Sequence, residues 1–128
     1  CLNYRYCLLE SCKDLVTILY MEQTNNILEE LDKTLKSRKK GDIDSSYVAS
    51  LFNEGISAMT NKILEEAQEL VETANSNGAN KKNLVHETAD LWFHTLVLLS
   101  YENITSVEIL NELSSRFGMS GLKEKKNR

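Results

Sequence analysis

The chain has 128 residues, a formal net charge of −4 and a pI near 5.2. Its length predicts one domain with one hydrophobic core. The acidic balance argues against a nucleic-acid-binding protein, which normally presents a basic surface. No run of about eighteen apolar residues occurs, so we expect no transmembrane span. The absence of proline indicates long helices.

The first twenty residues hold all three cysteines, Cys1, Cys7 and Cys12. Their spacing matches no zinc-ligand pattern, and an odd number cannot pair completely within the chain. We interpret them as thiols of a reducing compartment, which predicts a cytoplasmic protein. Residues 1–20 are therefore expected to be an N-terminal extension, and residues 21–128 to be the functional domain.

Apolar residues recur at helical spacing from Glu22 to Lys40, with acids early and bases late. This pattern predicts an amphipathic first helix that ends before Gly41. A second helix is expected to begin near Tyr47 and to continue through Ala74, with a point of close packing or bending at Gly55. The residues that can cap its start are Asp44, Ser45 and Ser46.

A polar turn follows, in which Gly78 is expected to cap the second helix. The next helix, NLVHETADLWFHTLVLL, is apolar on nearly all sides, so we expect it to be buried, with Trp92 and Phe93 in the core. Thr105 can cap a last helix. No strand is indicated, and the prediction is an all-α bundle of four helices. Surplus apolar surface on the central helix predicts a homodimer.

Acidic side chains recur at helical spacing on both central helices. On the first, Lys62, Glu66 and Glu69 share one face, with Glu65 one position to the side. Two antiparallel helices of this kind can direct four carboxylates into one gap, which suits a hard divalent cation bound through oxygen. The residues that share a face on the second helix are Glu87, Asp90 and His94.

Most glutamate pairs on helices are simply solvated surface. Glu87 and Asp90, however, belong to a helix that we expect to be buried, where an unpartnered carboxylate costs several kcal/mol. Lys62 alone is too little positive charge for so many acids. A cation from solution fits better, and we predict a Mg²⁺ site.

Protein-bound Mg²⁺ commonly binds the phosphate chain of a substrate. A metal ion can bridge acidic protein groups and phosphates and can activate water for attack on phosphorus. Basic side chains must then meet the outer phosphates, and Lys62, Arg38 and Lys39 are available. Because the chain has no Gly-rich phosphate loop, this pattern predicts a phosphoanhydride hydrolase rather than a P-loop enzyme.

The motif EExxE followed by ExxD resembles the all-helical MazG-type nucleoside triphosphate pyrophosphohydrolases. The segments SSYVASLFNEGISAMTNKILEEAQELVETA, HETADLWFHTLVLL and RFGMSGLKEKKNR resemble, more narrowly, the phosphoribosyl-ATP pyrophosphatase family. The resemblance implies Mg²⁺-dependent hydrolysis of the α-β phosphoanhydride of phosphoribosyl-ATP to phosphoribosyl-AMP and pyrophosphate. That reaction is the second step of L-histidine biosynthesis.

The resemblance also implies residue roles. It implies four metal ligands, Glu66, Glu69, Glu87 and Asp90. Spacing leaves open whether Glu65 or Glu66 is the ligand and which of them orients the attacking water. Lys62 would contact phosphate. His94 is a substrate-binding candidate, although a hydrogen-bonded histidine at a helix or dimer interface fits equally well, because Mg²⁺ prefers oxygen. Further substrate-binding candidates are Arg38, Ser46, Tyr47, Arg116, Ser120, Lys125 and Arg128.

Two other hypotheses remain. A pyrophosphohydrolase acting on a damaged or surplus nucleotide would share the mechanism but differ in its base pocket. A non-enzymatic helical dimerisation module would carry the same acids as structural residues and would show no dependence on metal.

Overall fold

The computed structural model describes residues 27–117, and within this range helices joined by turns and loops are the regular secondary structure. The all-helical prediction is confirmed. Residues 1–20, and the beginning of the predicted first helix, lie outside the described range. The five helices are α3 (Ile27–Arg38), α4 (Tyr47–Glu54), α5 (Ile56–Asn75), α6 (Lys81–Tyr101) and α7 (Ser106–Arg116).

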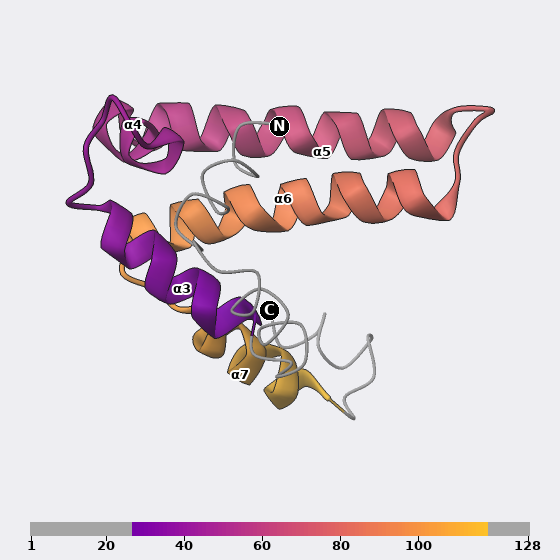
Figure 1. Cartoon of the computed structure of the whole chain (residues 1–128). Coiled ribbons are helices and arrows are strands. Elements are labelled where there is room, and N and C mark those ends of the chain that lie inside the picture. The colour runs from indigo at the N-terminus through magenta and orange to yellow at the C-terminus, as the bar shows by residue number, and fades with distance from the viewer. Residues whose placement is uncertain (1–26, 118–128) are drawn as a thin grey trace, which may run out of the picture.

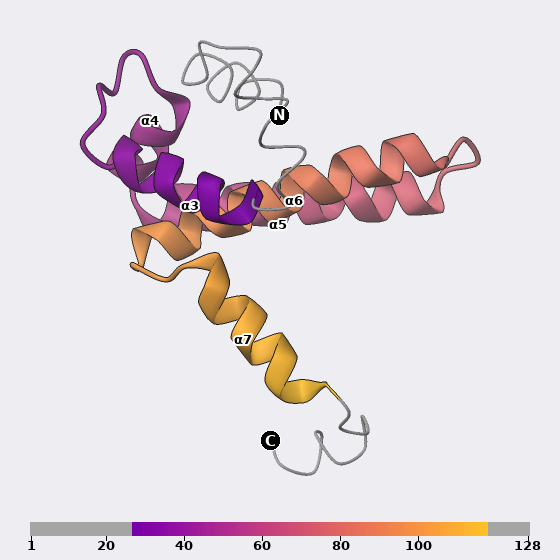
Figure 2. The same ribbon diagram turned by 60° about the horizontal axis from the view of Figure 1, so that its bottom comes forward.

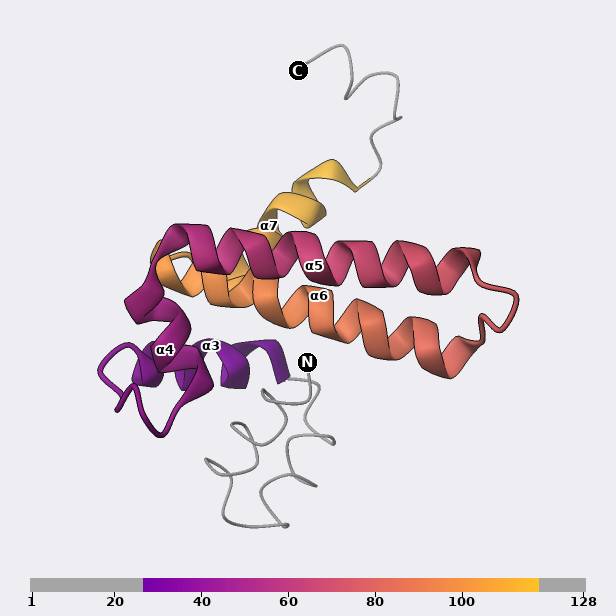
Figure 3. The ribbon, with the colours of Figure 1, turned by 90° about the horizontal axis from the view of Figure 1, so that it is seen from above.

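Helices α5 and α6 form a long antiparallel hairpin, which is the most extensive helix pair in the described chain (Figures 1 and 3). Helices α3 and α4 pack at the open end of this hairpin, away from the turn that joins α5 to α6 (Figure 3). Helix α7 packs on α3 and then diverges from the hairpin (Figure 2). No helix within residues 27–117 is long and apolar enough to cross a membrane.

The long helix predicted from Tyr47 to Ala74 is wrong at one point, because the chain breaks it at Gly55. This glycine has φ 96°, a conformation that residues with a Cβ rarely adopt. Its N–H closes α4 on the carbonyl of Leu51 at 3.1 Å, and its carbonyl accepts from Met59 N–H in the first turn of α5 at 3.3 Å. The bend predicted at Gly55 is therefore a break between two separate helices.

Local hydrogen bonds decide where the helices begin. Of the three predicted caps for α4, Ser46 is the one used, since its Oγ accepts from the N–H of Ala49 at 3.2 Å. Thr105 begins α7 as predicted, and its N–H donates to Glu108 Oε2 at 2.8 Å. The cap predicted at Gly78 is wrong. Helix α5 ends at Asn75, and Ser76 follows in extended backbone, without the left-handed residue that a glycine cap supplies.

The hydrophobic core lies at the open end of the hairpin, where α3, α4, α5 and α6 meet. Its buried members are Leu35, Val48, Leu51, Met59, Phe93, Leu96 and Val97. Phe93 is in the core as predicted, but the prediction for Trp92 is wrong, because its side chain is 60% exposed. Neighbouring helical residues point about 100° apart, so a single core cannot cover both.

A side chain of α3 forms hydrogen bonds with the start of α7. Asp32 Oδ2 accepts a hydrogen bond from the backbone N–H of Ser106 at 3.0 Å and another from its hydroxyl group. Asp32 thereby satisfies a donor at the start of α7, where a negative charge also complements the helix dipole.

Candidate functional site

Helices α5 and α6 bring three carboxylates together. One oxygen from each of Glu66, Glu69 and Glu87 lies within 4.8 Å of the others. Glu66 is fully buried, and Glu69 and Glu87 are half-buried. Spacings of three residues on α5 and an antiparallel partner helix place these side chains in one gap.

Asp90 lies one turn beyond Glu87 on α6 and is 1% exposed. Asp90 does not meet the 4.8 Å limit that defines the group of three. Its negative charge nevertheless helps to raise the pKa of both Glu66 and Glu87. His86 Nε2 lies 3.3 Å from Asp90 Oδ2. The sequence analysis missed His86, although its spacing of four residues from Asp90 was a usable signal.

These carboxylates suit a hard cation. Among residues 27–117, no hydrogen bond reaches Glu87 Oε2 or either carboxylate oxygen of Asp90, and all three atoms are buried. Buried carboxylate oxygens are expensive unless a cation or a donor satisfies them. The donor set consists of oxygen atoms only, which is the set that Mg²⁺ prefers.

Burial disfavours the ionised form of two of these carboxylates, Glu66 and Glu87. It raises the pKa of Glu66 from 4.5 to about 7, with further contributions from a hydrogen bond to Glu69 and from the charge of Glu69. Burial also raises the pKa of Glu87, again assisted by the charge of Glu69. A bound cation would reverse this preference, because it favours the carboxylate form.

The structure separates the two glutamates that spacing could not distinguish. Glu66 is buried within the group of three, whereas the side chain of Glu65 is 52% exposed and is not part of that group. Lys62 Nζ donates to Glu65 Oε2 at 3.0 Å and lies 3.9 Å from Glu66 Oε1. Burial alone would lower the pKa of Lys62, but the hydrogen bond to Glu65 and nearby negative charge outweigh it, so the pKa is raised and the ammonium persists.

His94 lies between the helices as a hydrogen-bonded side chain that is 1% exposed. Its Nδ1 donates to the carbonyl of Asp90 at 2.9 Å, and its Nε2 is 3.0 Å from the hydroxyl group of Tyr47. Burial lowers the pKa of His94, so the neutral ring is favoured. Tyr47 is half-buried, and burial is the largest cause of its raised pKa.

The other predicted substrate-binding residues are placed less centrally. Ser46 caps α4 beside Tyr47, and Arg38 lies in the last turn of α3. Arg116 ends α7 and pairs with Glu112 at 2.9 Å, on the helix that diverges from the hairpin (Figure 2). Residues Ser120, Lys125 and Arg128 lie outside the described range.

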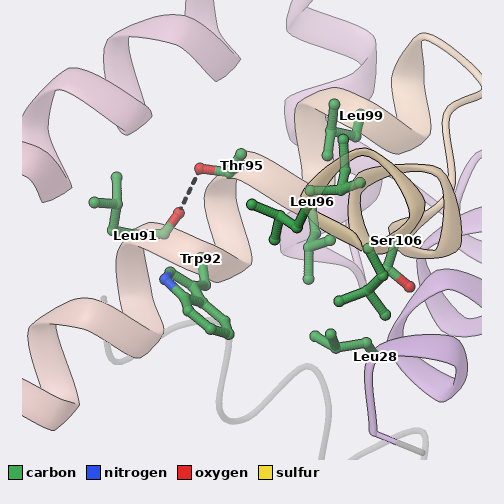
Figure 4. A pocket seen from close by; sticks show the side chains of 10 residues that line it. Leu28, Leu91, Trp92, Thr95, Leu96, Leu99 and Ser106 are labelled. Atoms are coloured by element: carbon green, nitrogen blue, oxygen red, sulfur yellow. Dashed lines mark hydrogen bonds between the residues drawn. The ribbon is translucent and has the colours of Figure 1, made fainter. Parts of the chain in front are cut away.

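A second feature is an apolar groove of about 410 Å³ between α6, α7 and Leu28 of α3 (Figure 4). Its walls include Trp92 and Leu99 of α6 and Leu110 and Leu113 of α7. The hydroxyl group of Thr95 in its wall donates to the carbonyl of Leu91 at 2.8 Å, so this polar group is satisfied within its own helix (Figure 4). The groove offers apolar surface and little else.

Comparison with known proteins agrees with this arrangement. The family model for phosphoribosyl-ATP pyrophosphohydrolase matches residues 28–117. The phosphoribosyl-ATP pyrophosphatase of Hydrogenovibrio crunogenus is 50% identical over 107 residues, which cover 82% of this chain and 95% of the relative. Those of Vesicomyosocius okutanii (50% over 104 residues, 81% and 97%) and Geobacter metallireducens (45% over 108 residues, 84% and 97%) are similarly close. The chain therefore belongs to the phosphoribosyl-ATP pyrophosphohydrolase family.

Proposed function

We propose that the protein hydrolyses the α-β phosphoanhydride of phosphoribosyl-ATP, giving phosphoribosyl-AMP and pyrophosphate, in the second step of L-histidine biosynthesis. Family membership and relatives of that name support the reaction. The single observation that carries it is the group of one buried and two half-buried carboxylates on α5 and α6, with the Lys62 ammonium beside them. We place this enzyme in the cytoplasm.

We propose Mg²⁺ as the cofactor, held by Glu66, Glu69, Glu87 and Asp90. The buried, unbonded oxygens of Glu87 and Asp90 support this ligand set. When bound, Mg²⁺ neutralises phosphate charge and lowers the pKa of a coordinated water. These four carboxylates would hold the ion, and Glu66 among them is completely buried.

The remaining residues act on the substrate. Lys62 meets a phosphate oxygen, since its ammonium lies at the edge of the carboxylate group. The burial of Glu66 favours it as a ligand and leaves the exposed Glu65 to orient the attacking water. Further binding roles are proposed for Arg38, Ser46, Tyr47, His94, Arg116, Ser120, Lys125 and Arg128.

The direct test is pyrophosphate release from phosphoribosyl-ATP, with and without Mg²⁺, with ATP and dUTP as control substrates. We expect Mg²⁺-dependent release from phosphoribosyl-ATP and little from the controls. Release from the controls alone would keep the site and overturn the substrate. Release from no substrate would favour the dimerisation-module hypothesis.

We also propose a homodimer in which the groove between α6 and α7 is covered by a second copy. Leu110, Leu113 and Trp92 line this groove and are 48%, 56% and 60% exposed, which is costly for large apolar side chains in contact with water. A second copy of the same chain is the partner that is always available at matching concentration.

Sedimentation velocity tests the dimer with two neighbouring substitutions that add the same charge. Leu110→Asp places a carboxylate in the groove and should yield a monomer, whereas Asn111→Asp changes an exposed position beside it and should not. A monomeric wild type, or a dimer unaffected by Leu110→Asp, would contradict this interface.

A further inference from the structure

A second cavity, of about 280 Å³, lies between α3 and the connection from α6 to α7. Its wall includes Lys33 and Lys36 of α3 and Lys39, which follows the end of that helix. None of the proposed metal ligands lines it. Ser100, in the same wall, is ten positions beyond Asp90 on α6, about 15 Å along the helix. The cavity is therefore separate from the carboxylate group.

Two of these lysines carry a positive charge that no carboxylate of the described chain neutralises. Lys36 and Lys39 form no ion pair within residues 27–117, whereas Lys33 pairs with Glu30 at 3.2 Å. Lys39 Nζ donates to the side-chain oxygen of Asn103, also in the wall, at 2.8 Å. This neutral partner holds the ammonium at the cavity and leaves its other N–H donors for a ligand. Such ammonium groups are common partners of phosphate.

The cavity wall also contains a buried hydroxyl group. Ser100 is 8% exposed, and among residues 27–117 its hydroxyl group forms no hydrogen bond. Ser50 and Ser115, by contrast, each satisfy theirs on a backbone carbonyl of their own helix. Because an unbonded hydroxyl group in a buried position costs free energy, Ser100 indicates a polar ligand in the cavity.

A carboxylate in the same wall restricts the kind of ligand. Asp32 Oδ2 accepts two hydrogen bonds from Ser106 at the start of α7, and a carboxylate can accept more. Its charge disfavours a ligand that is anionic throughout and favours one that also carries hydroxyl donors. The volume of 280 Å³ lies just below the usual range of small-molecule sites, which begins at about 300 Å³, so the ligand is small.

We propose that this cavity binds a sugar phosphate, with the phosphate group against Lys36 and Lys39 and the sugar hydroxyl groups toward Asp32 and Ser100. A phosphorylated ribose has two sources, a free sugar phosphate and the phosphoribosyl end of the proposed substrate. Only the second source rests on the proposed function.

Calorimetric titration of the full chain with ribose 5-phosphate in EDTA tests the site without turnover. We expect ribose 5-phosphate to bind about tenfold more tightly than ribose or inorganic phosphate. Lys36→Met and Lys39→Met should each weaken its binding about tenfold, as loss of a charge-assisted contact would, and Ser100→Ala about threefold. Lys40→Met, at an exposed position beside Lys39 and outside the cavity, should leave binding unchanged.

Lys62→Met separates this cavity from the carboxylate group, because Lys62 is the lysine beside those carboxylates. It should leave the affinity for ribose 5-phosphate unchanged, and a loss in this variant would overturn the proposal. So would equal affinities of Lys40→Met and of a double variant with Lys36→Met and Lys39→Met. Equal affinity of the wild type for inorganic phosphate and ribose 5-phosphate would also overturn it.

Hydrolysis kinetics distinguish the two sources of the ligand. A higher KM for phosphoribosyl-ATP in Lys36→Met and Lys39→Met, with kcat unchanged, would assign the cavity to the phosphoribosyl end of the substrate. An unchanged KM, together with weaker binding of ribose 5-phosphate, would assign it to a free sugar phosphate. In a protein that fails to hydrolyse phosphoribosyl-ATP, the calorimetric result would stand and only the proposed substrate would be overturned.

Discussion

Apolar side chains are usually buried and charged ones exposed, and two faces of helix α6 depart from this rule in opposite directions. Toward α5, Glu87, Asp90 and His94 place polar groups in a gap between helices, and Asp90 and His94 are almost completely buried. Toward α7, Trp92 and Leu99 line a groove, and Trp92 is 60% exposed. One helix therefore carries buried acids on one side and exposed apolar surface on the other.

The comparison indicates that the two faces bind different partners, a cation on one side and apolar surface on the other. Buried carboxylates cost several kcal/mol unless a cation compensates, whereas exposed apolar surface forfeits about 25 cal/mol per Å². Neither arrangement stabilises the isolated chain. Departures from local rules of this kind mark function, and here they separate a face for chemistry from a face for assembly.

The largest effect is expected from a substitution on the acidic face of α6, which carries Glu87 and Asp90. Asp90→Asn should lower kcat/KM by about 10³-fold, because the variant lacks the carboxylate charge of one proposed Mg²⁺ ligand. In EDTA the variant should melt no lower than wild type, since it removes a buried charge. A kinetic assay and a thermal melt check both, with Glu72→Gln, an exposed carboxylate on α5, as the control. A variant that melts well below wild type would make Asp90 a structural residue.

Metal binding should have the next largest effect. A ligand bound only by the folded state stabilises it by about 2.7 kcal/mol at a hundredfold excess over its Kd. We therefore expect Mg²⁺ to raise the melting temperature of wild type, measured by calorimetry against EDTA. The shift should shrink for Asp90→Asn. Equal shifts in both proteins would place the ion elsewhere.

The pH dependence of stability should be smaller and has a definite sign. Because the pKa of Glu66 is raised from 4.5 to about 7, the folded state retains a proton that the unfolded state releases, so stability falls as pH rises through this window. The lowered pKa of His94 acts in the opposite sense below its ordinary 6.5. In EDTA we expect a loss of about 1 kcal/mol from pH 6.5 to 8.

Glu66→Gln provides the control for this effect, because it cannot ionise. Chemical denaturation at each pH should show a flatter profile for the variant, and saturating Mg²⁺ should flatten the wild-type profile as well. A wild-type profile that is already flat in EDTA would show that the pKa of Glu66 is close to its ordinary value.

The smallest effect is expected on the apolar face. Trp92 is the single tryptophan of the chain, so its fluorescence reports on the groove directly. If a second copy covers the groove, dilution should shift the emission to longer wavelength as Trp92 becomes exposed to water. The spectrum of Leu110→Asp should already be shifted at high concentration, and that of Asn111→Asp should follow wild type.

Sequence periodicity was sufficient for the helices and for the residues of the acidic face. Carboxylates three residues apart on two helices are visible without coordinates, and so is the cap at Thr105. The break at Gly55 was not predictable as a break, because a glycine inside a helix costs only about 1 kcal/mol and is often tolerated.

Two site details also required the structure. Glu65 and Glu66 are equivalent by spacing, and only the packing of α5 against α6 decides which of them is buried. Trp92 was predicted in the core because α6 is apolar on most sides. Such a pattern cannot say which side the chain itself covers and which it leaves for a partner.

The break at Gly55 also determines how far apart two residues of the site can lie. In one continuous helix, the fifteen positions that separate Tyr47 from Lys62 would place their backbones about 22 Å apart. Because the helix breaks at Gly55, the hydroxyl group of Tyr47 instead lies 3.0 Å from His94 Nε2, beside the carboxylate group that Lys62 also contacts. Gly55, which is not itself a site residue, thus determines where Tyr47 lies. A substitution there that favours a continuous helix would move Tyr47 away from the site.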